Sequence, residues 1–120
     1  MNIGKTGKSG EDRVAAFLRS KGYKVIKRNY TSRYGEIDII AEIGEYIVFV
    51  EVKTRKANSL VSGAATVDYH KQRRIMSTAN DFLTKTECEL QPRFDVAEVT
   101  VSKRLDGSDS YSLNYIKNAF

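Results

Sequence analysis

Two carboxylates and an amine interrupt a hairpin that is otherwise apolar. Within residues 35–56, Asp38 stands in the first apolar run, and Glu51 and Lys53 stand in the second. Burying a charge is costly unless it is paired or bound to a cation. Two carboxylates can hold a divalent metal, and an ammonium beside them can stabilise charge that develops on a phosphate. The alternative is a pair of lysine–carboxylate salt bridges at the edge of a sheet.

The spacing of the two acids predicts that they meet across the hairpin. Alternate residues of a strand share one face, so the second strand has one face that turns from apolar to charged: Ile47, Phe49, Glu51, Lys53 and Arg55. If a two-residue turn pairs Ile43 with Tyr46, Asp38 falls opposite Glu51, with Cβ atoms about 4.5–5.5 Å apart. A three-residue loop would instead place the two acids on opposite faces.

A third carboxylate, Glu11, lies on or beside the apolar stripe of the first predicted helix, which Val14, Ala15 and Leu18 define. It joins Asp38 and Glu51 if the helix begins over the charged end of the hairpin. A glutamate in the first turn also favours the helix dipole, which is the alternative explanation. A site of carboxylates without Cys or His favours Mg²⁺ or Mn²⁺ over zinc.

The hydrophobic pattern predicts seven elements in a single domain over residues 1–120. Residues 1–9 are polar and glycine-rich and are expected to form a flexible arm, and Ser9 is expected to cap the helix that follows. Residues 57–66 are expected to form a loop. The expected elements are a helix over 10–21, strands over 23–30, 36–42 and 46–54, a helix over 68–85, and strands over 93–101 and 110–117. The order α-β-β-β-α-β-β predicts an α/β fold with a central mixed β-sheet flanked by helices.

The charge is unevenly distributed along the chain. The net charge is +5; residues 1–34 carry nine bases and two acids, residues 35–52 carry five acids and no base, and residues 53–74 carry six bases and one acid. An acidic island between basic flanks suits a metal site that a polyanion approaches, although chance clustering on a solvated surface gives the same counts. The chain has no long apolar run, and Cys88 is its single cysteine. We therefore expect no membrane association and a cytoplasmic setting.

Candidate contacts to nucleic acid follow the hairpin and open the second helix. They are Arg55, Lys71, Gln72, Arg73 and Arg74. Lys71 and Gln72 begin the inward-facing arc of this helix, with a solvated first turn as the alternative. Tyrosines are interleaved with basic residues, notably Tyr23, Tyr30 and Tyr34, and could stack on unpaired bases or pack in the core.

Asp38 followed by Glu51-Val52-Lys53 on consecutive strands resembles the PD-(D/E)XK signature of restriction-endonuclease-like nucleases. The motif's proline is replaced by Ile37. The segments GEDRVAAFLRSKGY, RNYTSRYGEIDIIA, VFVEVKTR and RFDV resemble the YraN-like family of small bacterial proteins, over roughly residues 4–101. This resemblance implies a metal held by the side chains of Asp38 and Glu51 and the carbonyl of Val52, a catalytic Lys53, and Glu11 as the helical glutamate of junction-resolving members.

The sequence therefore predicts a Mg²⁺- or Mn²⁺-dependent endonuclease that hydrolyses phosphodiester bonds in nucleic acid. Branched or damaged DNA is the first candidate substrate, and the residues do not distinguish DNA from RNA. Junction cutting usually needs two sites and the chain offers one, so a homodimer is one of the oligomeric states that the sequence leaves open. Two alternatives remain open: a nucleic-acid-binding module on the same fold without turnover, and a protein-interaction scaffold whose acids form salt bridges.

Overall fold

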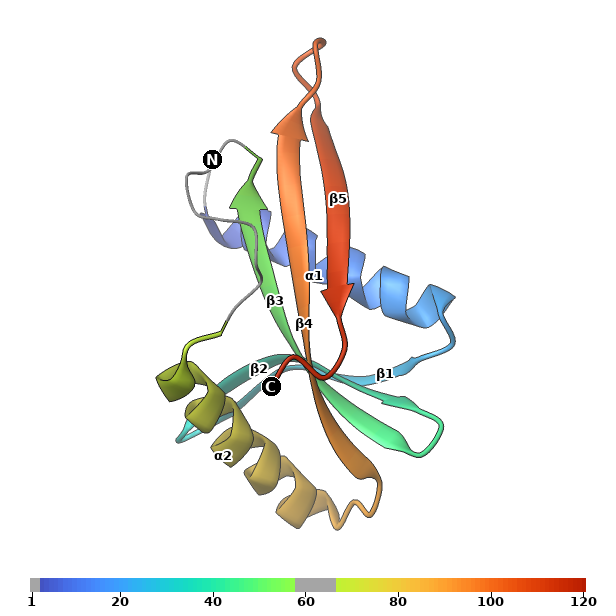
Figure 1. Ribbon diagram of the computed structural model, residues 1–120, viewed down its shortest axis with the longest axis vertical. Coiled ribbons are helices and arrows are strands. Elements are labelled where there is room, and N and C mark those ends of the chain that lie inside the picture. Colours follow the sequence, from blue (N-terminus) through green and yellow to red (C-terminus); the bar gives the residue numbers. More distant parts are fainter. Residues whose placement is uncertain (1–2, 58–66) are drawn as a thin grey trace.

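The protein is built around one five-stranded sheet with a helix on each face (Figure 1). The computed structural model describes residues 3–57 and 67–120, and the side chains of residues 9–57 and 67–120. The elements are α1 (Ile3–Ser20), β1 (Lys24–Ser32), β2 (Gly35–Ile43), β3 (Tyr46–Lys56), α2 (Tyr69–Thr86), β4 (Gln91–Lys103) and β5 (Asp109–Ile116). The strands lie in chain order; β3 and β4 are parallel, and the other neighbours are antiparallel. The predicted mixed α/β sheet of the restriction-endonuclease-like class is confirmed.

The sheet separates two hydrophobic cores, and β3 contributes to both. Val48 and Val50 pack with α1, whereas Ile47 and Phe49 pack with α2. Successive side chains of a strand point to opposite faces, so the uninterrupted apolar run of β3 reflects burial on both sides. The helix α2 is the crossover that parallel pairing of β3 and β4 requires.

The second helix and the turns follow the sequence closely, whereas the first helix is longer than predicted. Asp68 caps α2 by accepting a hydrogen bond from the Lys71 amide, and Gly22, with φ +91°, follows the end of α1 as predicted. The expected arm over residues 1–9 is wrong for residues 3–9, which form the first turns of α1, so Ser9 is no N-cap. Extending a helix that is already nucleated costs little per residue. Residues 1–2, and most of the expected loop over 57–66, lie outside the described residues.

The register of the β2–β3 hairpin is the one predicted for a two-residue turn. Ile43 pairs with Tyr46, and the ladder continues to Ile39 opposite Val50. The regular pairing stops there, one position before Asp38 and Glu51 would face each other. The two strands therefore separate at the point where the predicted carboxylate pair begins.

At the point where β2 and β3 separate, the side chains of β1 and β2 no longer alternate regularly between the two faces of the sheet. Arg28 reaches α1 and Ile39 packs in the α1 core, whereas Tyr30 and Ile37 belong to the core beneath α2. Residues two apart in a regular strand share a face, so both strands change sides across their intervening residues. The intervening residue of β1, Asn29, has a φ of +52°. Asparagine adopts this left-handed conformation more readily than other non-glycine residues.

The helix α1 lies close against β3 at Gly10. A Cβ atom added to this glycine would overlap Thr54 Oγ1. The lack of a side chain at Gly10 therefore sets how near the next residue, Glu11, comes to the sheet.

We predict that Gly10→Leu pushes α1 away from β3 and destabilises the protein by about 1–3 kcal/mol, the usual cost of overpacking. Urea denaturation measures the change in the free energy of unfolding. Ala16→Leu places the same side chain on the exposed face of α1 and should leave stability within about 0.5 kcal/mol. Equal effects of the two leucines would show that the close approach is not constrained.

Candidate metal centre

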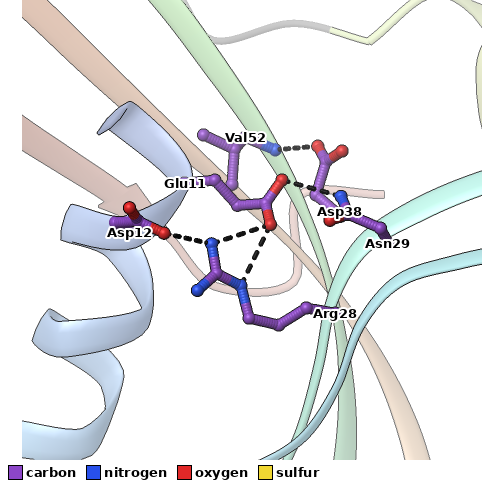
Figure 2. A network of polar contacts seen from close by, with 6 residues as sticks. All are labelled: Glu11, Asp12, Arg28, Asn29, Asp38 and Val52. Atoms are coloured by element: carbon purple, nitrogen blue, oxygen red, sulfur yellow. Dashed lines mark hydrogen bonds and ion pairs between the residues drawn. The ribbon is translucent and has the colours of Figure 1, made fainter. Parts of the chain in front are cut away.

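The carboxylate of Asp38 occupies the gap where β2 and β3 separate. Its Oδ2 accepts a hydrogen bond of 2.8 Å from the backbone amide of Val52 (Figure 2). The N–H and C=O groups of one strand residue point toward the same neighbouring strand. The Val52 carbonyl therefore also points toward β2, which is the arrangement that a carbonyl ligand beside Asp38 requires.

Asp38 lies in an environment that disfavours its negative charge. Burial, followed by the charge of Glu51, raises the pKa of Asp38 to about 7, although the Val52 amide acts in the opposite sense. Glu11 and Glu36 raise this pKa further. No cation of the described residues forms an ion pair with Asp38. The charge of Glu51 thus acts on Asp38, whereas their pairing directly across the hairpin stays a prediction.

Glu51 is held from the α2 side of the sheet. Its side chain is 12% exposed, and its Oε2 lies 3.5 Å from the Nζ of Lys71 in the first turn of α2. This contact places Lys71 beside a predicted metal ligand. The alternative expectation was that Lys71 lies in a solvated first turn of the helix. Lys53 is half-buried and forms no ion pair within the described ranges.

Glu11 reaches the site from the α1 side, but it is engaged by β1. Its Oε1 accepts a hydrogen bond from Arg28 Nε at 3.0 Å, and its Oε2 accepts one from Asn29 Nδ2 at 2.9 Å (Figure 2). Asp12 also binds the Arg28 guanidinium. These contacts orient Glu11 firmly, and its charge still contributes to the raised pKa of Asp38.

The predicted nucleic-acid contacts fall into two groups. Arg55 and Gln72 are engaged within the protein: Arg55 Nη2 lies 2.8 Å from Glu98 Oε2, and Gln72 donates to the Val67 carbonyl. Arg73 and Arg74 are exposed on α2, where Arg73 donates to the hydroxyl of Tyr69. The exposed pair can meet a phosphate without breaking an internal ion pair.

The donor set suits a hard cation that keeps bound water. Within residues 3–57 and 67–120, no group of three or more His, Cys, Asp or Glu side chains is arranged to hold a metal ion. Mg²⁺ typically binds one or two carboxylates and retains several waters. Asp38, Glu51 and the Val52 carbonyl match this pattern. They do not match a zinc centre, because zinc sites are built chiefly from Cys and His, and this set contains neither.

Sequence reasoning missed Arg28 and Asn29, which fix Glu11. Neither residue belongs to a motif of the hairpin, and both lie on a strand whose regular alternation would point them to opposite faces. Two signals were available. Both residues open the segment RNYTSRYGEIDIIA, which resembles the YraN-like family, and asparagine is depleted in strands and tolerates the left-handed conformation. The charge of Arg28 could not be assigned without knowing that α1 packs over β1.

We predict that Asp38→Asn stabilises the metal-free protein much more at about pH 8 than at about pH 5. A carboxyl whose native pKa is raised contributes stability that is complete below its unfolded pKa, near 4, and is lost as the pH rises through about 7. Asparagine removes this penalty and can still accept the Val52 amide. At about 1.4 kcal/mol per pKa unit, the gain grows by on the order of 3 kcal/mol between pH 5 and pH 8.

Thermal melting in EDTA measures this difference in stability. Glu89→Gln removes one negative charge at an exposed position and should follow the wild-type pH profile. If Asp38→Asn melts at the wild-type temperature at both pH values, the carboxylate is not strained in the native state.

No helix in the described part of the chain is long and apolar enough to cross a membrane.

Comparison with known proteins connects this chain to a bacterial family. The model of uncharacterised protein family UPF0102 matches residues 10–99. A UPF0102 protein from Persephonella marina is 36% identical over 110 residues, which cover 91% of this chain and 95% of that protein. A UPF0102 protein from Caldicellulosiruptor saccharolyticus is 38% identical over the whole of both chains, and one from Alkaliphilus metalliredigens is 40% identical over 95% of this chain and 96% of its own. The chain therefore belongs to the UPF0102 family.

Proposed function

We propose that the protein is a Mg²⁺- or Mn²⁺-dependent endonuclease that hydrolyses phosphodiester bonds in DNA. The observation that carries this proposal is the strained charge of Asp38. Its carboxylate lies beside Glu51 and Glu11, its pKa is raised to about 7, and no described cation pairs with it. A divalent cation would relieve this repulsion, and proteins commonly retain such costly clusters at functional sites.

Each residue of the site has a role that its position supports. Asp38 and Glu51 would hold the cation with the Val52 carbonyl, since Asp38 and Val52 already contact each other. A bound Mg²⁺ or Mn²⁺ would supply an activated water and neutralise phosphate charge. Lys53, which has no ion-pair partner among the described residues, would stabilise the charge that develops on the phosphate.

In this proposal Glu11 acts through its charge and not as a ligand of the cation. Because Arg28 and Asn29 hold its carboxylate, Glu11 keeps a fixed negative charge beside Asp38 and ties α1 to β1. Its effect on the cation is therefore electrostatic, and removing it should weaken metal binding less than removing Asp38 does.

The charge distribution supports a polyanionic substrate. Basic residues surround the acidic hairpin in the sequence, and Arg73 and Arg74 are exposed on the helix that carries Lys71. Cations of this kind bind the phosphate backbone without reading its sequence. We propose branched or damaged DNA as the substrate, cut by two copies of the chain acting as a homodimer.

A second candidate, binding of nucleic acid without cleavage, is favoured by the Lys71–Glu51 contact. The ammonium of Lys71 lies 3.5 Å from Glu51 Oε2 and supplies part of the positive charge that the site needs. Among the residues whose side chains are described, Asp38 has no such partner, so we prefer the metal-dependent function. Salt-dependent binding that persists in Asp38→Ala, with no cleavage by wild type, would establish this second candidate.

We predict that wild type cleaves branched or nicked DNA with Mn²⁺ or Mg²⁺ and that Asp38→Ala or Glu51→Ala lowers the rate by roughly 100-fold or more, because each removes a ligand of the cation. Single-turnover cleavage measures the rate. Lys53→Met should lower the rate by a similar factor without weakening metal binding.

The matched control is Glu89→Ala, an exposed acid distant in sequence from the hairpin, which should cleave at the wild-type rate. Circular dichroism checks that each variant is folded. If the two carboxylate variants cleave as fast as wild type, the activity comes from a contaminant and the proposal fails.

We also predict that Lys71→Gln tightens Mn²⁺ binding by roughly fivefold, because it removes a cation that competes for Glu51. Isothermal titration calorimetry measures the affinity. Lys85→Gln is the control, since Lys85 pairs with Asp81 near the other end of α2. Unchanged Mn²⁺ affinity in Lys71→Gln would show that the metal does not bind Glu51.

A further inference from the structure

A cavity of about 660 Å³ opens at the end of the β2–β3 hairpin opposite to the carboxylate site. It lies between the last turn of α1, the hairpin turn, the first residues of β4 and the end of β5. Asp38 is five residues from Ile43, which lines the cavity. At about 3.3 Å per strand residue, the two places are roughly 16 Å apart. The cavity is therefore separate from the candidate metal centre.

Aromatic rings form much of the wall. The ring centroids of Tyr23 and Tyr115 are 6.5 Å apart, and those of Phe17 and Tyr115 are 5.5 Å apart. Tyr46, the first residue of β3, adds a fourth ring. Flat aromatic surfaces of this kind stack on nucleobases, and the interaction tolerates any base.

Arg93 lines the cavity as a buried and rigidly held cation. Its side chain is 8% exposed, its Nε and Nη2 both donate to Asp95, and Nη2 also donates to the hydroxyl of Tyr23. Asp95 is fully buried and accepts further hydrogen bonds from Tyr115 and from the amide of Asn118. This network fixes the guanidinium before any ligand arrives.

One terminal group of Arg93 is left for a ligand. Its Nη1 forms no hydrogen bond within the described residues, yet it is not sealed from solvent. Since Arg93 lines the cavity, the Nη1 hydrogens are available to an acceptor there. The core network therefore leaves an unused donor on a wall of the cavity.

The charges around the cavity favour a phosphate over a carboxylate. Lys21 and Lys117 are exposed at its edge and join Arg93, against Glu45 on the rim and Asp95 beneath. The guanidinium edge that would bind a carboxylate in bidentate fashion is already occupied by Asp95. A phosphate monoester, with about two negative charges and three acceptor oxygens, can instead meet three separate cations.

We propose that this cavity binds a nucleoside 5′-monophosphate, either as a free nucleotide or as the 5′-phosphorylated end of a strand. The base stacks on the half-buried rings of Tyr46 and Tyr115, beside Tyr23 in the core. The phosphate contacts Arg93 Nη1 with Lys21 and Lys117. The site does not use Asp38 or Glu51, so it stands whether or not the protein cleaves nucleic acid.

The test titrates the protein in EDTA with AMP and follows the tyrosine ring signals by NMR. We expect a dissociation constant of about 1 mM or tighter, with shifts at Tyr23, Tyr46 and Tyr115. Adenosine and inorganic phosphate, each titrated alone, should bind at least roughly tenfold more weakly, because each keeps one of the two contacts. Asp38→Ala should bind AMP as wild type does, which separates this site from the metal centre.

The decisive variant is Lys21→Gln with Lys117→Gln, because both lysines are exposed and their loss does not touch the buried Arg93 network. It should weaken AMP binding by roughly tenfold. Lys24→Gln with Lys27→Gln removes the same charge from exposed positions on β1 and should leave the affinity unchanged. AMP that binds the cavity variant and wild type equally, or that shifts no tyrosine signal at millimolar concentration, overturns the proposal.

Two oligonucleotides distinguish the sources of the ligand. A 5′-phosphorylated pentanucleotide that binds more tightly than AMP, and loses this advantage without its phosphate, identifies a strand end. AMP that binds at least as tightly as the pentanucleotide identifies a free nucleotide. Both results support the cavity as a nucleotide site. An unphosphorylated pentanucleotide that binds as tightly as the phosphorylated one contradicts the role of the phosphate.

Discussion

The hydrogen bond from the Val52 amide to the Asp38 carboxylate joins β2 and β3 where their backbone ladder has ended. A backbone donor in a half-buried position needs a partner, and here a side chain takes the place of the opposing carbonyl. The carboxylate is thereby held between the two strands. The opening of the hairpin thus creates the site and fixes its central acid at the same time.

The two helices then deliver charged groups to this opening from opposite faces of the sheet. On one side, α1 brings Glu11, whose carboxylate is held by Arg28 and Asn29. On the other side, α2 brings Lys71 to Glu51. The close approach of α1 at Gly10 and the cap of α2 at Asp68 set these positions. Asp38 lies in the sheet between the two helices, and the charges of Glu11 and Glu51 both raise its pKa.

The hairpin and its register were predictable because local rules fix them. A two-residue turn pairs Ile43 with Tyr46, and alternation then assigns Val48 and Val50 to one core and Ile47 and Phe49 to the other. The same alternation failed at Asn29 and Asp38, where both strands change faces. That inversion needs the strand bend, the left-handed Asn29 and the packing of α1 together. A two-residue periodicity in the sequence therefore cannot predict this change of faces.

The sequence by itself determined the order of the elements, the mixed sheet and the three charged residues of the hairpin, because apolar periodicity and turn chemistry act over a few neighbouring residues. Only the tertiary structure decided which charged groups contact each other. The packing of helices and strands sets three such contacts: Arg28 with Glu11, Lys71 with Glu51, and Arg93 with Asp95. Two of these three pairs join residues at least 17 positions apart, and the third is buried by elements distant in the chain. Such contacts depend on the packing of whole elements, which local periodicity does not encode.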